Sequence, residues 1–438
     1  MPHRLIAILS RVLSAVPWRI VLVGTVVAAG ATARAAELPA ARERPLSYAE
    51  AVELLKARNR DVQFAQRNVE AAQADTIGAR ARPNPNLSFN AVAISPHAFG
   101  SGGPQDKSID SIVQLSQLIE RGNKRGLRTE ATRLALDATR GDLADAVRRT
   151  TLTLAGAYYD LLFAQERARI TEDTSALLAK TVAAAELRLK AGDVARADLS
   201  RIRVDQLRAE NDHRAAVSDR ERARISLAYV VGLDAEAGAL VATDPWPTAG
   251  DLAMVDVAAT IEARPDVRAS ALRLQAAEKA RDLARALKSR DVTLAVQYER
   301  FPDQIQNNTL GFGVSMPLFL NYSFEGEIRR AEVNFQAAED GLERTRALAR
   351  AEIDSAWSSL TSARDRVQRY EGGLLKEAQR AADAAEFAYR NGALGVIDLL
   401  DARRILAATR SDAAAAQADL ARALVAWQAA TVSYPSSR

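Results

Sequence analysis

The chain contains 438 residues, 48% of them hydrophobic, with 59 lysines and arginines, 55 aspartates and glutamates and no cysteine. The first 35 residues hold four of the basic residues and no acidic one. The remainder is therefore electrically neutral and gives no support to nucleic-acid binding. The lack of cysteine excludes disulfides, thiolate metal sites and a lipid attached to an N-terminal cysteine.

Residues 1–35 are expected to form a cleaved export signal. Several arginines precede an apolar stretch at 20–31, and Ala33-Arg34-Ala35 ends in the small residues that signal cleavage requires. An uncleaved membrane anchor is the alternative, but the apolar run is short for a membrane span. No later segment of the sequence is long and apolar enough to predict a transmembrane helix.

Helices dominate the prediction for the exported part of the chain. A capping-box pattern, Ser47 followed by Glu50, opens the first of them. In chain order, the expected helices cover 46–82, 123–190, 194–231, 255–289, 323–390 and 394–431. An unbroken helix over 123–190 would be roughly 100 Å long, which exceeds any compact domain. Alanine stretches such as 413–416 favour close packing of helix on helix.

Two pairs of short strands are expected between the helices. Apolar residues alternate with small or polar ones at 292–298 and at 310–318, a period of two and a length typical of strands that cross a membrane. The corresponding segments of the first half, 87–94 and 112–119, show the same pattern less clearly.

The sequence repeats itself at an offset of about 200 residues. The segment AELRLKAG at 185–192 matches AEFAYRNG at 385–392, and an Asp-Leu pair follows six positions after each final glycine. Because the chain contains two copies of one long unit, each half of the chain is a structural unit. We therefore predict a first repeat over 36–232, a linker over 233–254, a second repeat over 255–432 and a C-terminal tail over 433–438.

Four strands per chain cannot close a barrel, and open strand edges are not tolerated in lipid. Other copies of the chain must then complete the sheet, and a homotrimer would supply twelve strands, enough to leave a lumen. The expected fold is mainly α with a membrane β-barrel portion, continued by a long helical barrel. Phe319, Tyr322 and Phe324 lie just past a strand end, where an aromatic girdle is expected; ordinary core aromatics are the alternative.

The chain resembles the TolC family of outer-membrane efflux channels over essentially its whole exported length. The resemblance is carried by the repeat, by the strand pairs between long helices, and by YRNG at 389–392 leading to DLLD at 398–401. Within that family, QLIERGNKR at 117–125, and PLF at 317–319 followed by GEI at 326–328, resemble the CzcC-like heavy-metal branch, which serves pumps of the resistance-nodulation-division (RND) class.

This resemblance implies a homotrimer in the outer membrane of a Gram-negative bacterium, in contact with its lipid, with the helical part in the periplasm. It implies two partners, a periplasmic membrane-fusion adaptor and an inner-membrane RND pump, and no enzymatic activity or cofactor. The implied cargo is divalent heavy-metal cations. Efflux of drugs or other organic compounds and type I protein secretion are alternatives. A periplasmic helical adaptor or scaffold is the alternative of another class.

The resemblance also implies an entrance at the helix ends. Tyr389, Asp398 and Asp401 match the family positions that line the closed periplasmic entrance. Asp398 and Asp401 are three positions apart and so share one helix face. No histidine lies near them in the sequence, which argues against acid–base catalysis.

The turns next to these residues are the implied tips that face the adaptor. They contain Gly192, Asp193, Gly392 and Leu394, and a plain helix-capping role for both glycines is compatible with that position. Family members can carry a basic residue where this chain has Leu394, so the resemblance does not fix the bonding at the entrance.

No metal site is expected. His97 and His213 are distant in sequence, and without cysteine they cannot form a transition-metal cage unless carboxylates dominate it. A basic cluster at 121–128 falls at a strand-to-helix junction. We expect a solvated helix start there, with contact to inner-leaflet headgroups as the alternative.

Overall fold

The computed structural model describes residues 43–92, 110–192, 194–248, 250, 256–300 and 308–431. The expected export signal, Asp193, the last two residues of the strand expected at 87–94 and the tail at 433–438 lie outside these residues.

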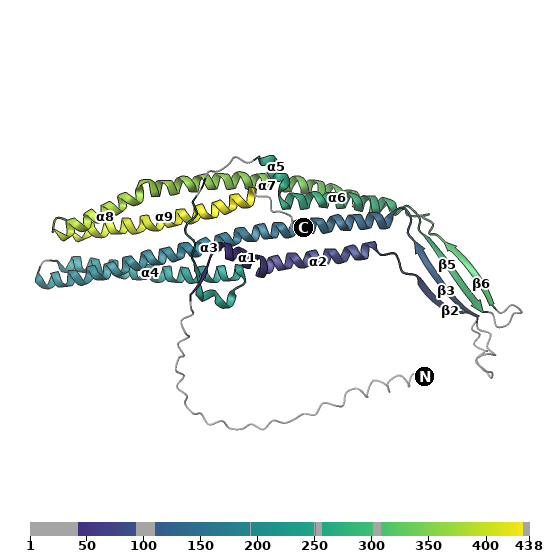
Figure 1. Ribbon diagram of the computed structural model, residues 1–438, viewed down its shortest axis with the longest axis horizontal. Helices are drawn as coiled ribbons and strands as arrows, with labels where there is room; N and C mark the ends of the chain where they lie inside the picture. Colours follow the sequence, from purple (N-terminus) through teal and green to yellow (C-terminus); the bar gives the residue numbers. More distant parts are fainter. Residues whose placement is uncertain are drawn as a thin grey trace, which may run out of the picture. The chain divides into compact units, whose positions relative to one another are not determined.

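The described elements occur twice in the same order (Figure 1). The first series is α1 (Tyr48–Arg58), α2 (Arg60–Arg80), β2 (Asn86–Val92), β3 (Asp110–Ile119), α3 (Lys124–Ala191) and α4 (Arg196–Val231). The second is α5 (Val257–Ala263), α6 (Pro265–Ala286), β5 (Val292–Arg300), β6 (Asn308–Ser315), α7 (Glu325–Arg369), a π-helical turn (Tyr370–Leu374), α8 (Leu375–Arg390) and α9 (Val396–Thr431). Helices α4 and α9 each have 36 residues and begin 200 positions apart, so the predicted two-fold repeat is present in the fold.

The longest predicted helix is confirmed as one unbroken element. Helix α3 has 68 residues, which corresponds to about 100 Å at 1.5 Å per residue. It packs against α2, α4, α6 and α9 and so joins the two halves. Its alanines and leucines form much of the core, together with those of α9.

Two of the predicted helices are each interrupted once, at positions 205 residues apart. Asn59 separates α1 from α2; its buried side chain donates to the Val230 carbonyl at 2.9 Å and caps the first turn of α2. Arg264 separates α5 from α6, where Pro265 lacks the N–H that a continuous helix would need. The prediction of continuous helices over 46–82 and 255–289 was therefore wrong.

The helix predicted over 323–390 is also interrupted. Gly372 and Gly373 lie in the π-helical turn between α7 and α8, and Gly373 has non-helical dihedral angles. Glycine favours the helix less than other residues do, which explains why the turn widens here and not in α3. The matching positions of α3 are Glu172 and Asp173, within a regular helix.

A small parallel sheet, which joins the start of the described chain to the linker, was not predicted. Strand β1 (Arg44–Leu46) pairs with β4 (Leu240–Ala242), which lies in the segment expected to be a linker or equatorial region. The linker also contains a 3₁₀ helix (Asp234–Ala239). The hydroxyl of Tyr158 donates to the Leu46 carbonyl at 3.0 Å, and burial raises the pKa of Tyr158 to about 12.

Four strands form one antiparallel sheet in the order β2-β3-β5-β6 (Figure 1). The register aligns Leu87, Leu115, Val296 and Phe312 across all four strands. These four side chains are exposed, and the apolar side chains two positions away on the same face are exposed too: Phe89, Val113, Leu294, Tyr298, Leu310 and Val314. The opposite face carries mainly Ser, Thr, Asn, Gln and Gly. The apolar face thus extends over the strands of both halves, although Ser111 and Gln117 of β3 are polar residues on it. Met316, Pro317 and Leu318, expected to be strand, lie beyond the end of β6 because no partner strand continues there.

Candidate functional site

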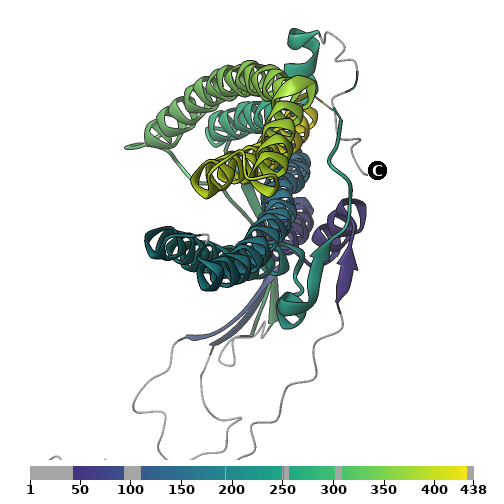
Figure 2. The same cartoon turned by 90° about the vertical axis from the view of Figure 1, so that its left-hand side faces the viewer.

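Each half ends in a helical hairpin closed by a glycine, and Figure 2 views the molecule from this end. Gly192 follows α3 with φ +86°, and Gly392 follows α8 with φ +74°. Both glycines donate their N–H to a carbonyl of the last helical turn and adopt the left-handed conformation that favours glycine. Gly192 is thus the C-cap of α3, and Gly392 follows Asn391, the C-cap of α8. Gly192 and Gly392 are exposed and Leu394 is half-buried.

The same ion pair closes both hairpins. Arg203 on α4 binds Glu186 on α3 at 2.6 Å, and Arg403 on α9 binds Glu386 on α8. Both pairs span 17 positions and are related by the 200-residue offset. The signal was present in the sequence, because glutamate and arginine recur at both places of the repeat.

The two hairpins also contact each other near their tips. Leu400 from α9 packs into a buried cluster with Val182 and Ile202 from the first hairpin. The guanidinium of Arg188 lies 5.1 Å from the centre of the Tyr389 ring. Of the expected entrance residues, Tyr389 is therefore the one that joins the two halves.

Asp398 and Asp401 both line one groove of about 580 Å³ between α4 and α9. Both are exposed. Asp401 lies 3.8 Å from Arg404, which in turn lies 3.5 Å from Asp205 on α4. Asp398 has no ion pair with any residue that the structure describes.

The groove carries charges of both signs, although only its aspartates were singled out from the sequence. Its charged lining consists of Asp205, Asp398, Asp401, Arg201, Arg208 and Arg404, three of each sign. Sequence reasoning missed Arg201, Asp205 and Arg208 because they come from α4, which is close in space and distant in the chain. Arg404 is three positions after Asp401, so an i, i+3 pair was the only local signal.

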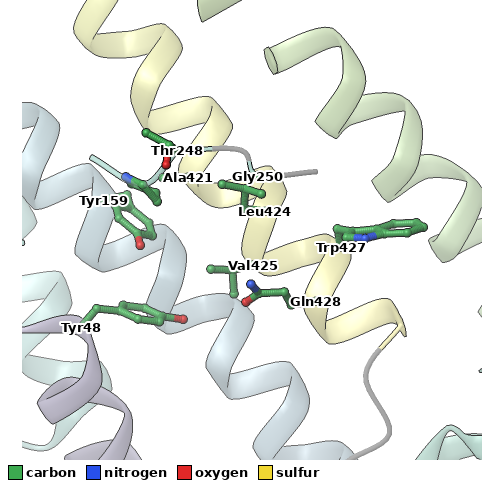
Figure 3. A pocket seen from close by; sticks show the side chains of 10 residues that line it. Tyr48, Tyr159, Thr248, Gly250, Ala421, Leu424, Val425, Trp427 and Gln428 are labelled. Carbon is green, nitrogen blue, oxygen red and sulfur yellow. The ribbon is translucent and has the colours of Figure 1, made fainter. Parts of the chain in front are cut away.

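A second hollow, about 360 Å³, lies where the linker crosses α3 and α9 (Figure 3). Tyr48, Tyr159, Val425 and Trp427 line it, and the Tyr48 and Tyr159 rings stack with centres 5.6 Å apart. The lining residues carry no charged side chain in the described structure. Among the described residues, the hollow therefore offers no carboxylate, histidine or lysine for acid–base chemistry.

No group of three or more His, Asp or Glu side chains in the described ranges could hold a metal ion. His213 lies beside Thr171, at 3.4 Å from its hydroxyl, and His97 is outside the described residues. None of the helices in this part of the chain combines the length and apolarity needed to cross a membrane.

The model of the family "Outer membrane efflux protein" matches residues 51–233 and 257–431, that is, most of both halves. The chain belongs to the outer membrane efflux protein family. The TolC-like resemblance and the mainly helical fold with a strand portion are confirmed. As a member of this family, the protein is an outer-membrane channel and not an enzyme.

Individual relatives are distant but cover most of the chain. The cobalt-zinc-cadmium resistance protein CzcC of Cupriavidus metallidurans is 24% identical over 83% of this chain and 84% of its own length. The pyoverdine export outer membrane protein OpmQ of Pseudomonas putida is 25% identical over 86% and 83%. The solved outer membrane protein VceC of Vibrio cholerae superposes with a TM-score of 0.72 at 20% identity, covering 88% of this chain and 95% of that one.

Proposed function

We propose that this efflux protein is the passive exit duct of a tripartite pump and that it works as a homotrimer. The four-stranded sheet carries the proposal. Its apolar face is exposed on all four strands, and β2 and β6 each have one edge without a partner among the described strands. Open edges are not tolerated in lipid, so three copies would join edge to edge into a twelve-stranded barrel. The long helices would continue that barrel into the periplasm.

Divalent heavy-metal cations are the proposed cargo. The support is the similarity to CzcC, together with an unpaired carboxylate, Asp398, in the tip groove. Asp398 would offer a passing cation one unpaired carboxylate without binding it tightly. Export of an organic compound is the second candidate, because OpmQ is equally similar and its name gives pyoverdine as its cargo. Type I protein secretion and an adaptor role have no observation in their favour.

The entrance is proposed at the hairpin tips. Tyr389, Asp398 and Asp401 would narrow it in the closed trimer, and the contact of Tyr389 with Arg188 would hold the second hairpin against the first. A periplasmic adaptor, itself bound to an inner-membrane RND pump, would dock on the tips.

Gly192, Gly392 and Leu394, with Asp193, are the residues proposed for the adaptor contact. The exposed glycine turns support this role, since each presents backbone and small side chains at the very end of a hairpin.

A deletion strain tests the cargo. The strain is challenged in parallel with zinc, cobalt and cadmium salts and with hydrophobic drugs, in a background without a redundant channel. The proposal predicts greater sensitivity to the metal salts, restored by a plasmid copy of the gene. Unchanged metal tolerance with increased drug sensitivity would transfer the proposal to organic compounds.

A further inference from the structure

The junction between the sheet and the helices is strongly basic. The four segments that flank the strands on this side (80–82, 120–130, 288–291 and 325–330) contain ten basic and five acidic residues. The segments that connect the strands at their other ends (92–110 and 299–308) contain two basic and four acidic residues. The net charge of the flanking segments therefore differs in sign between the two ends of the strands.

Two arginines of this junction continue the apolar face. The register of β3 and β5 ends at Ile119 opposite Val292. Two positions further, on the same face, it would place Arg121 opposite Arg290. The strands are still adjacent here, because the Arg121 N–H donates to the Asp291 carboxylate at 2.9 Å. Both arginines are exposed.

Two acidic residues of this junction are paired with basic side chains, whereas Arg121 and Arg290 have no acidic partner in the described structure. Glu120 and Asp291, which fall on the other face, are bound by Arg128 at 2.8 Å and by Lys124 at 2.9 Å. Neither Arg121 nor Arg290 has an ion pair with a described residue, and Arg290 instead lies over the Phe319 ring at 5.8 Å. Like charges placed opposite each other across two strands are unfavourable unless an anion lies between them.

We propose that Arg121 and Arg290 bind the phosphate groups of anionic phospholipids in the periplasmic leaflet of the outer membrane. This inference rests on the proposed barrel, in which the apolar face contacts lipid. The arginines lie where that face ends, at the depth where headgroups begin, and arginine suits phosphate because its planar donors bind two oxygens at once. Phe319 holds the Arg290 guanidinium at this boundary.

Native mass measurement of the full-length protein with bound lipid tests the proposal. Detergent-solubilised protein is mixed with phosphatidylglycerol and phosphatidylcholine in equal amounts. The wild type retains phosphatidylglycerol preferentially, and Arg121→Gln with Arg290→Gln weakens that retention by roughly tenfold. Arg121→Lys with Arg290→Lys keeps most of it. Arg214→Gln with Arg344→Gln is the matched control, since both residues are exposed, unpaired in the described structure and on helices away from the strands, and it changes nothing.

Three results would overturn the proposal. The first is equal retention of both lipids by the wild type. The second is full retention of phosphatidylglycerol by the double glutamine variant. The third is displacement of the lipid by millimolar inorganic phosphate but not by sodium chloride of equal ionic strength. In that case Arg121 and Arg290 would be a site for free anions. The same spectra give the oligomer mass, so trimers without a lipid preference contradict this inference alone, whereas monomers contradict the proposed function.

Discussion

Asp398 and Asp401 have different surroundings although they line the same groove. Arg404 partly neutralises Asp401 at 3.8 Å, whereas Asp398 is unpaired in the described part of the chain. In a trimer both would recur three times around one axis, and a ring of carboxylates favours cations. Asp398 is therefore expected to contribute more of the cation preference than Asp401.

Planar-bilayer recordings test this difference. Asp398→Ala is predicted to reduce cation preference more than Asp401→Ala does, and the double variant is predicted to raise conductance while trimers still form. Asp340→Ala, a change to an exposed and unpaired aspartate on α7, serves as the control. Wild-type conductance and selectivity in the double variant would place the constriction elsewhere.

Tyr389 offers a test of the contact between the hairpins. Removing the ring by Tyr389→Ala should cost about 0.5–1 kcal/mol of cation–π attraction to Arg188. Conductance is expected to rise because the second hairpin is held less firmly. Tyr389→Phe keeps the ring and should behave as the wild type, so equal conductance of the two variants would contradict a role for this contact.

Arg264 lies at the centre of a buried ionic cluster where α6 begins. It binds Asp266 at 2.7 Å and Glu352 at 2.6 Å, and Arg148 lies beside them. Burial alone would raise the pKa of Asp266, but hydrogen bonds from Arg264 and the charges of both arginines lower it below its ordinary value. The stabilisation is thus complete above the unfolded pKa, about 3.9, and is lost as the pH falls through the folded pKa.

Thermal unfolding in detergent, followed by circular dichroism, tests this account. Asp266→Asn should lower the melting temperature at pH 7, and its melting temperature should fall less than that of the wild type when the pH is reduced below 4. Glu262→Gln breaks an exposed pair with Arg346 and should matter little. Parallel acid profiles for wild type and Asp266→Asn would exclude this carboxylate as the source.

The two faces of β5 should differ in whether they tolerate an introduced charge. Val296 lies on the exposed apolar face and Gln297 on the polar one. Val296→Lys would place a charge in lipid at a cost of about 2–4 kcal/mol near the midplane. Gln297→Lys would face the water-filled lumen.

Assembly into outer membranes distinguishes the two substitutions. Val296→Lys should reduce the amount of membrane-inserted protein, whereas Gln297→Lys should insert normally. If both variants insert equally well, the apolar face does not contact lipid.

The sequence predicted those elements whose signal is local. The long α3, both strand pairs and the glycine turns follow from composition, period and repeat. The break at Arg264 was missed although Pro265 was a local signal against a continuous helix. The break at Asn59 was missed because its side chain is fixed by a partner far away in the chain, the Val230 carbonyl. The mixed charge of the tip groove was missed for the same reason, since α4 supplies half of it.

For the whole molecule, the repeat explains why a channel can be built from so few strands. Each half contributes two strands and one hairpin, and α3 and α9 join the halves. One chain has two strand pairs with an apolar face and open outer edges. It is therefore incomplete as a membrane protein. Assembly with further copies is therefore the expected state of the chain in the membrane.

The most direct test is the mass of the full-length protein extracted from outer membranes in mild detergent. Native mass measurement is predicted to show a trimer, and chemical cross-linking is predicted to give dimers and trimers and nothing larger. A stable monomer that stays in aqueous solution without detergent would contradict the account, because its sheet would then expose an apolar face to water.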